Sequence, residues 1–301
     1  MKTSIYHPII LLFLFVNLLF SSCNSFQTEN IFEETPSLTN SSIQSDNNDS
    51  IASIDSLKND SIQLSMDKHI QTQQNIIDST KLYIYLTFDD GPFKGSEKIN
   101  RIISEEQIKA TVFIVGLNSY TKRLQQHIDD YKANQYIEVA NHTFSHANRN
   151  KFVGYYKQPS VVLEDVIRND SMFTFKNRFV RLPGRNVWHL GKQTKYDYDQ
   201  ASRNSANYLA EHKYYILGWD YEWRRLNKNH PLENPSKIYD GIVSRLKNHE
   251  TLNKNHMVLL MHDDMFDNDH DAEKLRELIR LIKQNKDFIF EVASNYPIEI
   301  S

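Results

Sequence analysis

Two neighbouring carboxylates stand where an apolar segment of the sequence ends. Asp89 and Asp90 follow the alternating segment 81–86 and are followed at once by a Gly-Pro pair. Alternating apolar residues predict a strand and Gly-Pro ends it, so both acids are expected at the edge of a sheet. Successive strand residues point to opposite faces, which predicts that the two acids face opposite ways and take different roles. A polar turn is the alternative, because Asp, Gly and Pro are common turn residues.

Two histidines four residues apart follow a second short apolar segment. His142 and His146 come just after residues 136–140, which read as a buried strand. With one separate carboxylate, they supply three protein ligands for a single metal ion. Three ligands leave positions open for water and substrate, which distinguishes a catalytic metal site from a structural one. Solvated or capping histidines are the alternative, but the shared position with Asp90 after a predicted strand favours metal ligands.

Strands and helices alternate along the chain from residue 81 onward, and these elements must position the acids and histidines. Apolar segments predict strands at 81–86, 110–115, 136–140, 179–181, 214–219, 257–261 and 288–292, with helical patterns between most of them. Alternating units of this length predict an α/β fold with a parallel sheet, and about seven strands favour a closed or nearly closed barrel. Such barrels build their active sites at the carboxyl ends of the strands, where the acids and histidines stand.

The sequence resembles the polysaccharide deacetylase superfamily, also called the NodB-homology domain or carbohydrate esterase family 4. Five short motifs of that family occur in the family's order, at residues 87–92, 142–146, 181–184, 218–223 and 259–263. The third motif lacks its usual aromatic residue, and the spacing of the fourth is altered. The resemblance implies a distorted (β/α) barrel with about seven parallel strands, which we expect over residues 81–301.

The resemblance also implies an activity and a cofactor. It implies metal-dependent hydrolysis of N-acetyl groups on an N-acetylglucosamine-containing glycan, such as peptidoglycan, chitin oligomers or an exopolysaccharide, with release of acetate. Asp90, His142 and His146 would hold one divalent ion, and Asp89 would be the general base. Two histidines and a carboxylate make zinc the first expectation, with cobalt or another divalent ion as the alternative.

Further roles follow from the later motifs. His262 suits the acid that protonates the leaving amine, because histidine can give up a proton near neutral pH. The resemblance implies that Arg181 orients Asp89 and keeps it ionised, and that Asp220 supports His262. Glu222 is the alternative to Asp220, because it directly precedes a tryptophan, as the family's acid does.

The residues expected at the substrate pocket include members of the two motifs that depart from the family pattern. Trp223 and Leu260 are expected to wall the pocket for the acetyl methyl group, although both also suit an ordinary core. Gly184 keeps a backbone N–H donor possible for the oxyanion but leaves the third motif without its ring. We hypothesise that Trp188 replaces that ring. An O-acetyl esterase, a non-glycan amidohydrolase of the same fold and a catalytically inactive glycan-binding lipoprotein remain the alternatives.

The first 80 residues differ in composition from the rest. Residues 1–22 combine a basic start with a short apolar stretch, which suits a signal peptide better than a membrane span. Cys23 is the single cysteine of the chain and follows two serines, an arrangement that resembles the lipid-attachment site of a bacterial lipoprotein. Residues 23–80 are rich in Ser, Asn, Asp, Gln and Thr and predict a flexible tether. We therefore expect an exported protein, lipid-anchored to a membrane of the bacterial cell envelope.

The charge balance narrows the class of partners. The 301 residues carry a formal net charge of −3 and no basic stripe, which argues against binding to nucleic acid. The expected partners are a glycan substrate and, through Cys23, a membrane, and the protein is expected to be a monomer.

Overall fold

The computed structural model describes residues 65, 68, 78–196, 200–225 and 230–299. The predicted signal peptide, Cys23 and almost all of the predicted tether 23–80 lie outside the described residues, so the fold is that of the predicted domain 81–301. In this described part of the chain, no helix combines the length and the apolar character needed to cross a bilayer.

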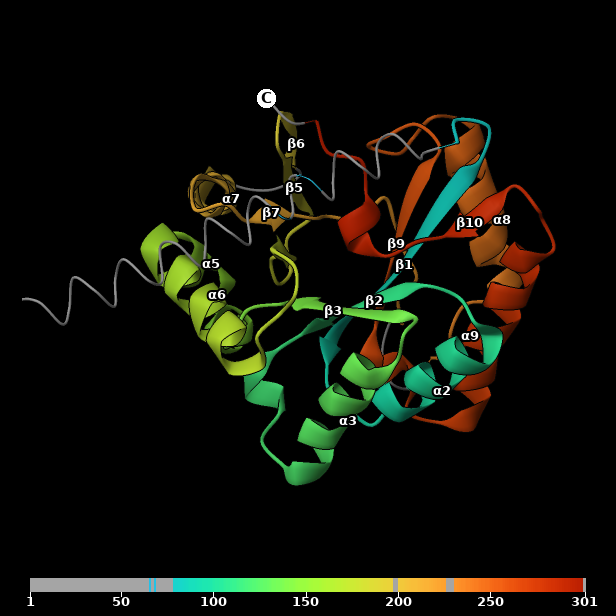
Figure 1. Cartoon of the computed structure of the whole chain (residues 1–301), viewed down its shortest axis with the longest axis horizontal. Helices are drawn as coiled ribbons and strands as arrows, with labels where there is room; N and C mark the ends of the chain where they lie inside the picture. The colour runs from blue at the N-terminus through green and yellow to red at the C-terminus, as the bar shows by residue number, and fades with distance from the viewer. Residues whose placement is uncertain (1–64, 66–67, 69–77, 197–199, 226–229, 300–301) are drawn as a thin grey trace, which may run out of the picture. The chain divides into compact units, whose positions relative to one another are not determined.

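Ten strands of the described residues form one sheet (Figure 1). The strands are β1 (Leu82–Gly91), β2 (Ala110–Ile114), β3 (Ile137–Asn141), β4 (Phe179–Val180), β5 (Val187–Leu190), β6 (Gln193–Tyr196), β7 (Tyr215–Ile216), β8 (Tyr221–Glu222), β9 (His256–His262) and β10 (Phe288–Phe290). Their order is β6-β5-β7-β4-β3-β2-β1-β9-β8, and β10 pairs with the start of β1. The seven strands from β7 to β8 all run parallel, which confirms the predicted parallel barrel architecture. The antiparallel pair β5–β6 was not predicted.

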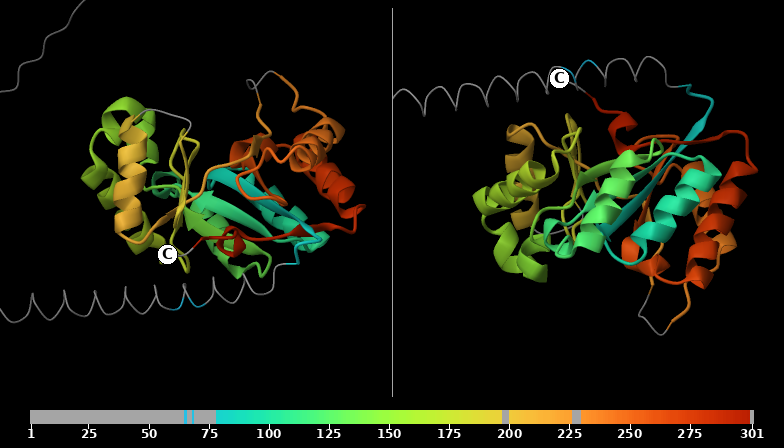
Figure 2. Two further views of the ribbon diagram at one scale, coloured as in Figure 1. Left: turned by 90° about the horizontal axis from the view of Figure 1, so that it is seen from above. Right: turned by 60° about the horizontal axis from the view of Figure 1, so that its bottom comes forward.

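Six longer helices occupy the connections between strands. They are α2 (Ser96–Glu106), α3 (Lys122–Ala133), α6 (Pro159–Phe173), α7 (Gln200–Glu211), α8 (Pro235–Lys247) and α9 (Asp269–Lys283). Shorter turns are α4 (His146–Asn150), α5 (Phe152–Tyr156), η1 (Gly116–Asn118), η2 (Asp263–Phe266) and η3 (Ala293–Asn295). Helices α5, α6 and α7 gather near β5 and β7, whereas α2, α8 and α9 lie on the other side, near β1 and β9, and the views in Figure 2 keep these groups apart.

Local sequence explains where several helices begin. Proline occupies the first turn of α6 and α8, where its missing N–H costs no helical hydrogen bond. The side chains of Thr121 and Asn268 accept hydrogen bonds from the first turns of α3 and α9. Such caps satisfy donors that a helix start would otherwise leave unpaired. These local features therefore mark the starts of α3, α6, α8 and α9.

Strand β1 is buried on both faces, and its residues change from apolar to polar towards its carboxyl end. Ile84, Leu86 and Phe88 pack into the core cluster that contains α2, α8 and α9. Tyr83 and Tyr85 alternate with them and belong to a second cluster on the other face. A continuous apolar strand of this kind is typical of a parallel sheet covered on both sides. On the second face the apolar residues give way to buried Thr87 and Asp89 towards the carboxyl end.

The pairing register brings the motif segments to one edge of the sheet. Asp89 of β1 is the register partner of His262 at the end of β9. Ile114 of β2 is opposite Asn141 of β3, and Asn141 is opposite Val180 of β4. The residues that follow these strand ends, including both histidines of the second motif, must therefore converge at the same carboxyl edge.

Candidate active site

A cavity of about 620 Å³ opens at this carboxyl edge. Seven of the predicted site residues line it: Asp89, Asp90, His142, His146, Gly184, Leu260 and His262. Trp219 and Glu222 of the fourth motif segment line it as well, so the structure gathers residues from all five motif segments at a single cavity, although they are up to 173 positions apart in the chain.

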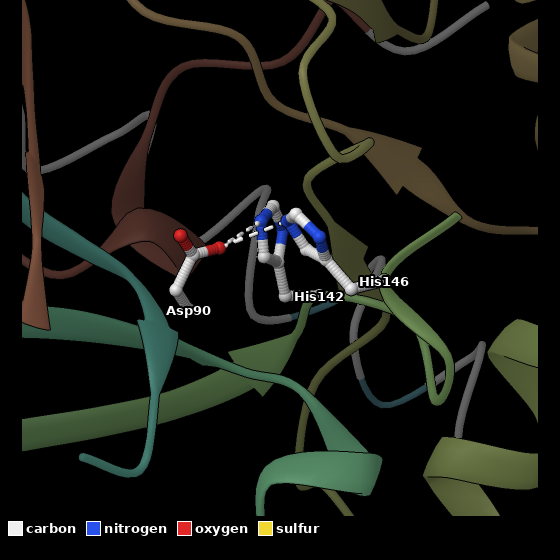
Figure 3. Close-up of side chains that lie close together, drawn as sticks. All are labelled: Asp90, His142 and His146. Carbon is white, nitrogen blue, oxygen red and sulfur yellow. Dashed lines mark ion pairs between the residues drawn. The ribbon is translucent and has the colours of Figure 1, made fainter. Parts of the chain in front are cut away.

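Asp90, His142 and His146 point toward a common centre (Figure 3). The Oδ1 atom of Asp90 lies 3.3 Å from Nε2 of His142 and 3.0 Å from Nε2 of His146. This Oδ1 atom is buried and has no hydrogen-bond partner among the described residues. One carboxylate oxygen and two imidazole nitrogens are the ligand types that a divalent cation such as zinc prefers. A bound cation would also provide the missing partner for the buried Oδ1 atom.

The opposite nitrogens of the two rings are held by hydrogen bonds. Nδ1 of His142 lies 2.8 Å from the backbone oxygen of Arg181, and Nδ1 of His146 lies 2.5 Å from Oδ1 of Asn150. An N–H at Nδ1 donates to these oxygens and leaves the Nε2 lone pair directed at the centre, which is the arrangement of metal-binding histidines. In the absence of an ion, burial by itself would raise the pKa of Asp90, but hydrogen bonds and charge from the two histidines in their protonated form outweigh it and hold that pKa well below the ordinary value. The carboxylate is therefore available in its charged form.

Backbone distortion brings Asp90 into the cavity. The register between β1 and β2 shifts between Phe88 and Gly91, and Asp90 has a φ of 72°. A regular strand would turn Asp89 and Asp90 to opposite faces, whereas a bulge with a left-handed residue re-aims the side chain. The expectation that the two acids face opposite ways is wrong, because both line the same cavity.

His146 begins a turn with an unusual hand. All five residues of α4, from His146 to Asn150, have positive φ between 50° and 67°. A left-handed backbone costs roughly 1–2 kcal/mol per non-glycine residue, so neighbouring groups must hold it. Oγ of Ser145 accepts a hydrogen bond from the Asn148 N–H, and Oδ2 of Asp165 accepts from both the N–H and the hydroxyl of Ser145.

Arg181 holds one oxygen of Asp89 from beneath the cavity. Its side chain is fully buried, and Nη1 donates to Oδ1 of Asp89 at 2.9 Å and to Oγ1 of Thr87 at 2.7 Å. Nε and Nη2 donate to the backbone oxygens of Leu217 and Gly218. The second oxygen of Asp89, Oδ2, lies 3.7 Å from Nε2 of His142 and so remains next to the metal-ligand cluster.

His262 and Asp220 are not brought together. His262 is half-buried, lines the cavity and sits beside Asp89 on the neighbouring strand. The carboxylate of Asp220 instead accepts hydrogen bonds from the backbone N–H groups of Leu252 and Val258, both at 2.9 Å. Val258 precedes His262 by four residues, which is about 13 Å along a strand. Burial raises the pKa of Asp220 to about 6, although both backbone donors lower it.

The altered spacing of the fourth motif accounts for this placement. Glu222 pairs in register with Leu260, so Asp220 falls one residue before β8, at the level of Val258. Glu222 does line the cavity, where its carboxylate lies 2.5 Å from Arg224. Between the two alternatives for the acid near His262, the structure therefore places Glu222, and not Asp220, at the cavity.

The aromatic residues of the cavity differ from those predicted. Trp188 and Trp223 are fully buried in the core, Trp188 against Tyr296 and Trp223 against Phe266. Neither is among the residues that line the cavity. Phe152 and Trp219 line it instead, together with Leu260.

Phe152 takes the space beside the incomplete third motif. Gly184 has a φ of +63°, and a Cβ there would lie 2.9 Å from the Phe152 ring. The ring also meets His146 edge-on, with 6.1 Å between ring centroids. Phe152 comes from α5 and belongs to no motif, so the sequence carried no signal for it. Trp219, in contrast, stands within the fourth motif and was open to prediction.

Comparisons with known proteins agree with this geometry. Residues 77–182 match the family model described as polysaccharide deacetylase. This segment contains Asp89, Asp90, His142, His146 and Arg181. A chitin disaccharide deacetylase from Vibrio alginolyticus is 25% identical over an alignment of 210 residues that covers 48% of each chain. The chain thus spans about half the length of this curated relative.

Two solved structures share the fold. The catalytic domain of a peptidoglycan N-acetylglucosamine deacetylase from Eubacterium rectale superposes with a TM-score of 0.54 at 19% identity, covering 75% of this chain and 94% of that chain. A family 4 carbohydrate esterase from Streptococcus mutans gives a TM-score of 0.51 at 20% identity, covering 73% and 90%. These likenesses extend the fold match beyond the segment covered by the family model.

Proposed function

Because residues 77–182 match the polysaccharide deacetylase family model, we propose that the chain hydrolyses N-acetyl groups on N-acetylglucosamine units of a glycan and releases acetate. The observation that carries this proposal is the convergence of Asp89, the Asp90–His142–His146 cluster and His262 on one cavity. The activities named for the Vibrio and Eubacterium relatives, on chitin disaccharide and on peptidoglycan, support a glycan of this class.

We propose that Asp90, His142 and His146 hold one divalent ion, with zinc as the first candidate and cobalt as the second. The partnerless Oδ1 of Asp90 and the two Nε2 atoms are the ligands that the donor set offers. When bound, such an ion lowers the pKa of a coordinated water from 15.7 towards about 7 and polarises a carbonyl oxygen.

Asp89 and His262 supply the proton transfers. Arg181 fixes Oδ1 of Asp89, so Oδ2 is the oxygen free to take the proton of the attacking water. The water oxygen adds to the acetyl carbon and the carbonyl electrons move to oxygen, which gives a tetrahedral intermediate. When this intermediate collapses, the carbon–nitrogen bond breaks, and the amine must receive a proton to leave. His262 stands beside Asp89 on the next strand and donates that proton, giving acetate and a free amine.

The cavity walls suit a small apolar acyl group next to a sugar. Leu260 offers an apolar surface at the cavity and is otherwise almost fully buried. Phe152 and Trp219 contribute half-buried rings to the same cavity. Aromatic faces pack well against apolar ring surfaces, so we assign them to the sugar and Leu260 to the acetyl methyl group.

Acetate release tests the proposal directly. The purified protein is incubated with N-acetylglucosamine oligomers and with peptidoglycan, before and after chelation and with zinc or cobalt added back. We expect metal-dependent release that falls about 10²- to 10⁴-fold in Asp89→Asn. Asp267→Asn, an exposed acid outside the cavity, is the matched control.

Other outcomes would indicate a different function for this protein. Release from O-acetylated xylan alone would replace the proposal with the esterase alternative. Tight glycan binding without release, in protein shown to contain metal, would indicate an inactive glycan-binding protein. Retention of full activity after complete metal removal would refute the role of the Asp90–His142–His146 cluster.

We further propose that the protein is exported and anchored in the cell envelope through a lipid on Cys23. Support comes from the apolar first segment and the position of the single cysteine. Mass spectrometry of the envelope fraction should show that Cys23 is the first residue of the processed protein and carries acyl chains. The Cys23→Ser variant should no longer be found in the membrane fraction. An unmodified Cys23 in the membrane fraction would contradict the proposal.

A further inference from the structure

Asp165 of α6 holds the chain on both sides of His146. Its Oδ2 atom accepts hydrogen bonds from the N–H and the hydroxyl of Ser145, at 3.1 Å and 2.8 Å, and from the hydroxyl of Tyr155 at 3.0 Å. Its backbone oxygen accepts a further hydrogen bond from the N–H of Phe144 at 3.2 Å. Ser145 directly precedes His146, and Tyr155 lies in α5, which follows α4. One residue outside the five motifs therefore fixes both the start and the end of the segment that carries a candidate metal ligand.

The acceptor in these hydrogen bonds is a carboxylate. Hydrogen bonds to an ionised acceptor are roughly twice as strong as those between neutral groups. Burial raises the pKa of Tyr155 above its ordinary value, and the charge of Asp165 raises it further, so the Tyr155 hydroxyl keeps its proton and donates a hydrogen bond. The Ser145 hydroxyl donates to Asp165 and accepts from the N–H of Asn148 in the middle of α4. The carboxylate is thus linked through Ser145 to the turn itself, and such linked hydrogen bonds favour a single arrangement.

The turn α4 needs support from neighbouring elements. Every residue of α4 has a positive φ, a conformation that persists only where surrounding contacts fix it. The hydrogen bond between His146 and Asn150 orients the imidazole ring within the turn, but both residues belong to α4. Ala147 is fully buried and packs the turn against the core, although apolar contacts of this kind have no preferred direction. The directed hydrogen bonds of Asp165 therefore fix how the turn lies against α6.

Asp165 lies behind the turn and not in the active-site cavity. Together with Ser145 and Tyr155 it lines a separate hollow of about 370 Å³. Among the described residues, those that line the active-site cavity include His146 but not Asp165. Asp165 is thus placed to act through His146 and not on the substrate. Phe152 also lies between Ser145 and Tyr155 in sequence, so the same hydrogen bonds bracket the ring that lines the cavity.

We propose that Asp165 is a positioning residue for His146 and thereby sets the affinity of the candidate metal site. The proposal rests on the proposed function, because it takes Asp90, His142 and His146 as the metal ligands. The ring of His142 is held through the backbone oxygen of Arg181, so the two histidine rings depend on different neighbours. Removing a group that orients a metal ligand typically lowers metal affinity about 10- to 100-fold. Loss of the Asp165 carboxylate should therefore weaken metal binding although every ligand is still present.

Zinc affinity measures this role without any glycan. Competition with a chromophoric chelator gives the dissociation constant of zinc at neutral pH for wild type, Asp165→Ala, Asp165→Asn and Glu164→Ala. We expect the affinity to fall about 10- to 100-fold in Asp165→Ala. The fall in Asp165→Asn should be smaller, because the amide oxygen can still accept from Ser145 and Tyr155. Glu164→Ala, at the exposed preceding position of α6, is the matched control and should bind zinc like wild type.

Two further variants separate positioning from general stability. Leu209→Ala removes a fully buried side chain of α7 from the core cluster that α6 shares, and it removes none of the hydrogen bonds of Asp165. Folded Leu209→Ala, confirmed by circular dichroism, should bind zinc like wild type, whereas Ser145→Ala should bind it more weakly. Unchanged affinity in Asp165→Ala, or an equal fall in Leu209→Ala, would overturn the proposal. If Asp165→Ala does not fold, unchanged affinity in both Ser145→Ala and Asp165→Asn would overturn it instead.

The same proteins separate failure of this role from failure of the proposed function. If Asp165→Ala binds zinc more weakly and zinc-loaded wild type releases no acetate from any glycan, the positioning role stands and the proposed hydrolysis fails. If wild type shows metal-dependent acetate release and Asp165→Ala binds zinc as tightly as wild type, the positioning role fails alone. If wild type binds neither zinc nor cobalt, both fail.

Discussion

Asp263→Asn should make the protein more stable above neutral pH. Asp263 is almost completely buried in η2, directly after His262. Its Oδ2 accepts hydrogen bonds from the hydroxyl of Ser96 at 2.5 Å and of Tyr131 at 3.2 Å, whereas Oδ1 has no partner among the described residues. Burial raises the pKa of Asp263 to about 7, although the bonds from Ser96 and Tyr131 lower it.

The size of the effect follows from this pKa. In the unfolded chain the pKa of an Asp is about 3.9, so between pH 4 and pH 7 the folded state binds the proton more strongly. The stability contributed by protonated Asp263 is complete below pH 4 and is lost as the pH rises through 7. A pKa difference of this size corresponds to about 4 kcal/mol. Asn keeps an acceptor for Ser96 and Tyr131 but cannot ionise, so it avoids the loss.

Urea unfolding from pH 4.5 to pH 8.5 measures the difference. The free energies of unfolding of wild type and Asp263→Asn should be similar at pH 4.5 and diverge in favour of the variant by about 2–4 kcal/mol at pH 8.5. Other titrating groups contribute equally to both proteins and cancel. Asp240→Asn, at an exposed position of α8, should show no such divergence. A difference that does not change with pH would refute the reasoning.

Three further predictions follow from buried or cavity-lining side chains. Arg181→Met should lower the free energy of unfolding by about 3–5 kcal/mol, because it leaves Asp89 buried and unpaired. In urea unfolding, adding Asp89→Asn should recover part of this loss. If the losses of the two single variants simply added in the double variant, the prediction would be contradicted. Phe152→Ala should raise KM for a glycan substrate more than it lowers kcat, and an effect on kcat alone would oppose a binding role. Burial lowers the pKa of His256 to about 4, so the free energy of unfolding should decrease as the pH falls from 6.5 to 4 and the unfolded state takes up the proton first. In urea unfolding, His256→Phe should lack this decrease, and an equal decrease in both proteins would contradict the prediction.

Much of the fold was predictable because it depends on patterns that are local in sequence. After Lys81, the segment 82–86 alternates aliphatic residues with tyrosines, and both faces of β1 are indeed buried. Helices α6 and α8 begin at prolines that mark helix starts. Parallel strands joined by helices must then present their carboxyl ends at one edge, so a common location for Asp89, His142 and His262 followed from topology.

Other features depended on geometry that no local pattern carries. The position of Asp220 is decided by the register of a two-residue strand, β8, against β9, and a shift of two residues would exchange Asp220 for Glu222 at the cavity. Trp188 was expected at the sugar site because it lies near the third motif, but its strand, β5, turns it into the core. Phe152 reaches Gly184 only through the fold of α4 and α5, which had no periodic signal.

Backbone strain links these unpredicted features to the candidate site. Of the twelve non-glycine residues with positive φ in the described chain, seven lie in the segments that carry the candidate metal ligands: Asp90, Thr143 and the five residues of α4. Such conformations cost free energy and persist where surrounding contacts fix them, often at functional sites. Here the bulge aims Asp90 into the cavity, and the left-handed turn begins at His146 and leads the chain on to Phe152. The conformational propensities of these residues favour neither the bulge nor the left-handed turn. The places where local reasoning from the sequence failed are thus those where the backbone departs from regular structure to bring the ligands of the candidate site together.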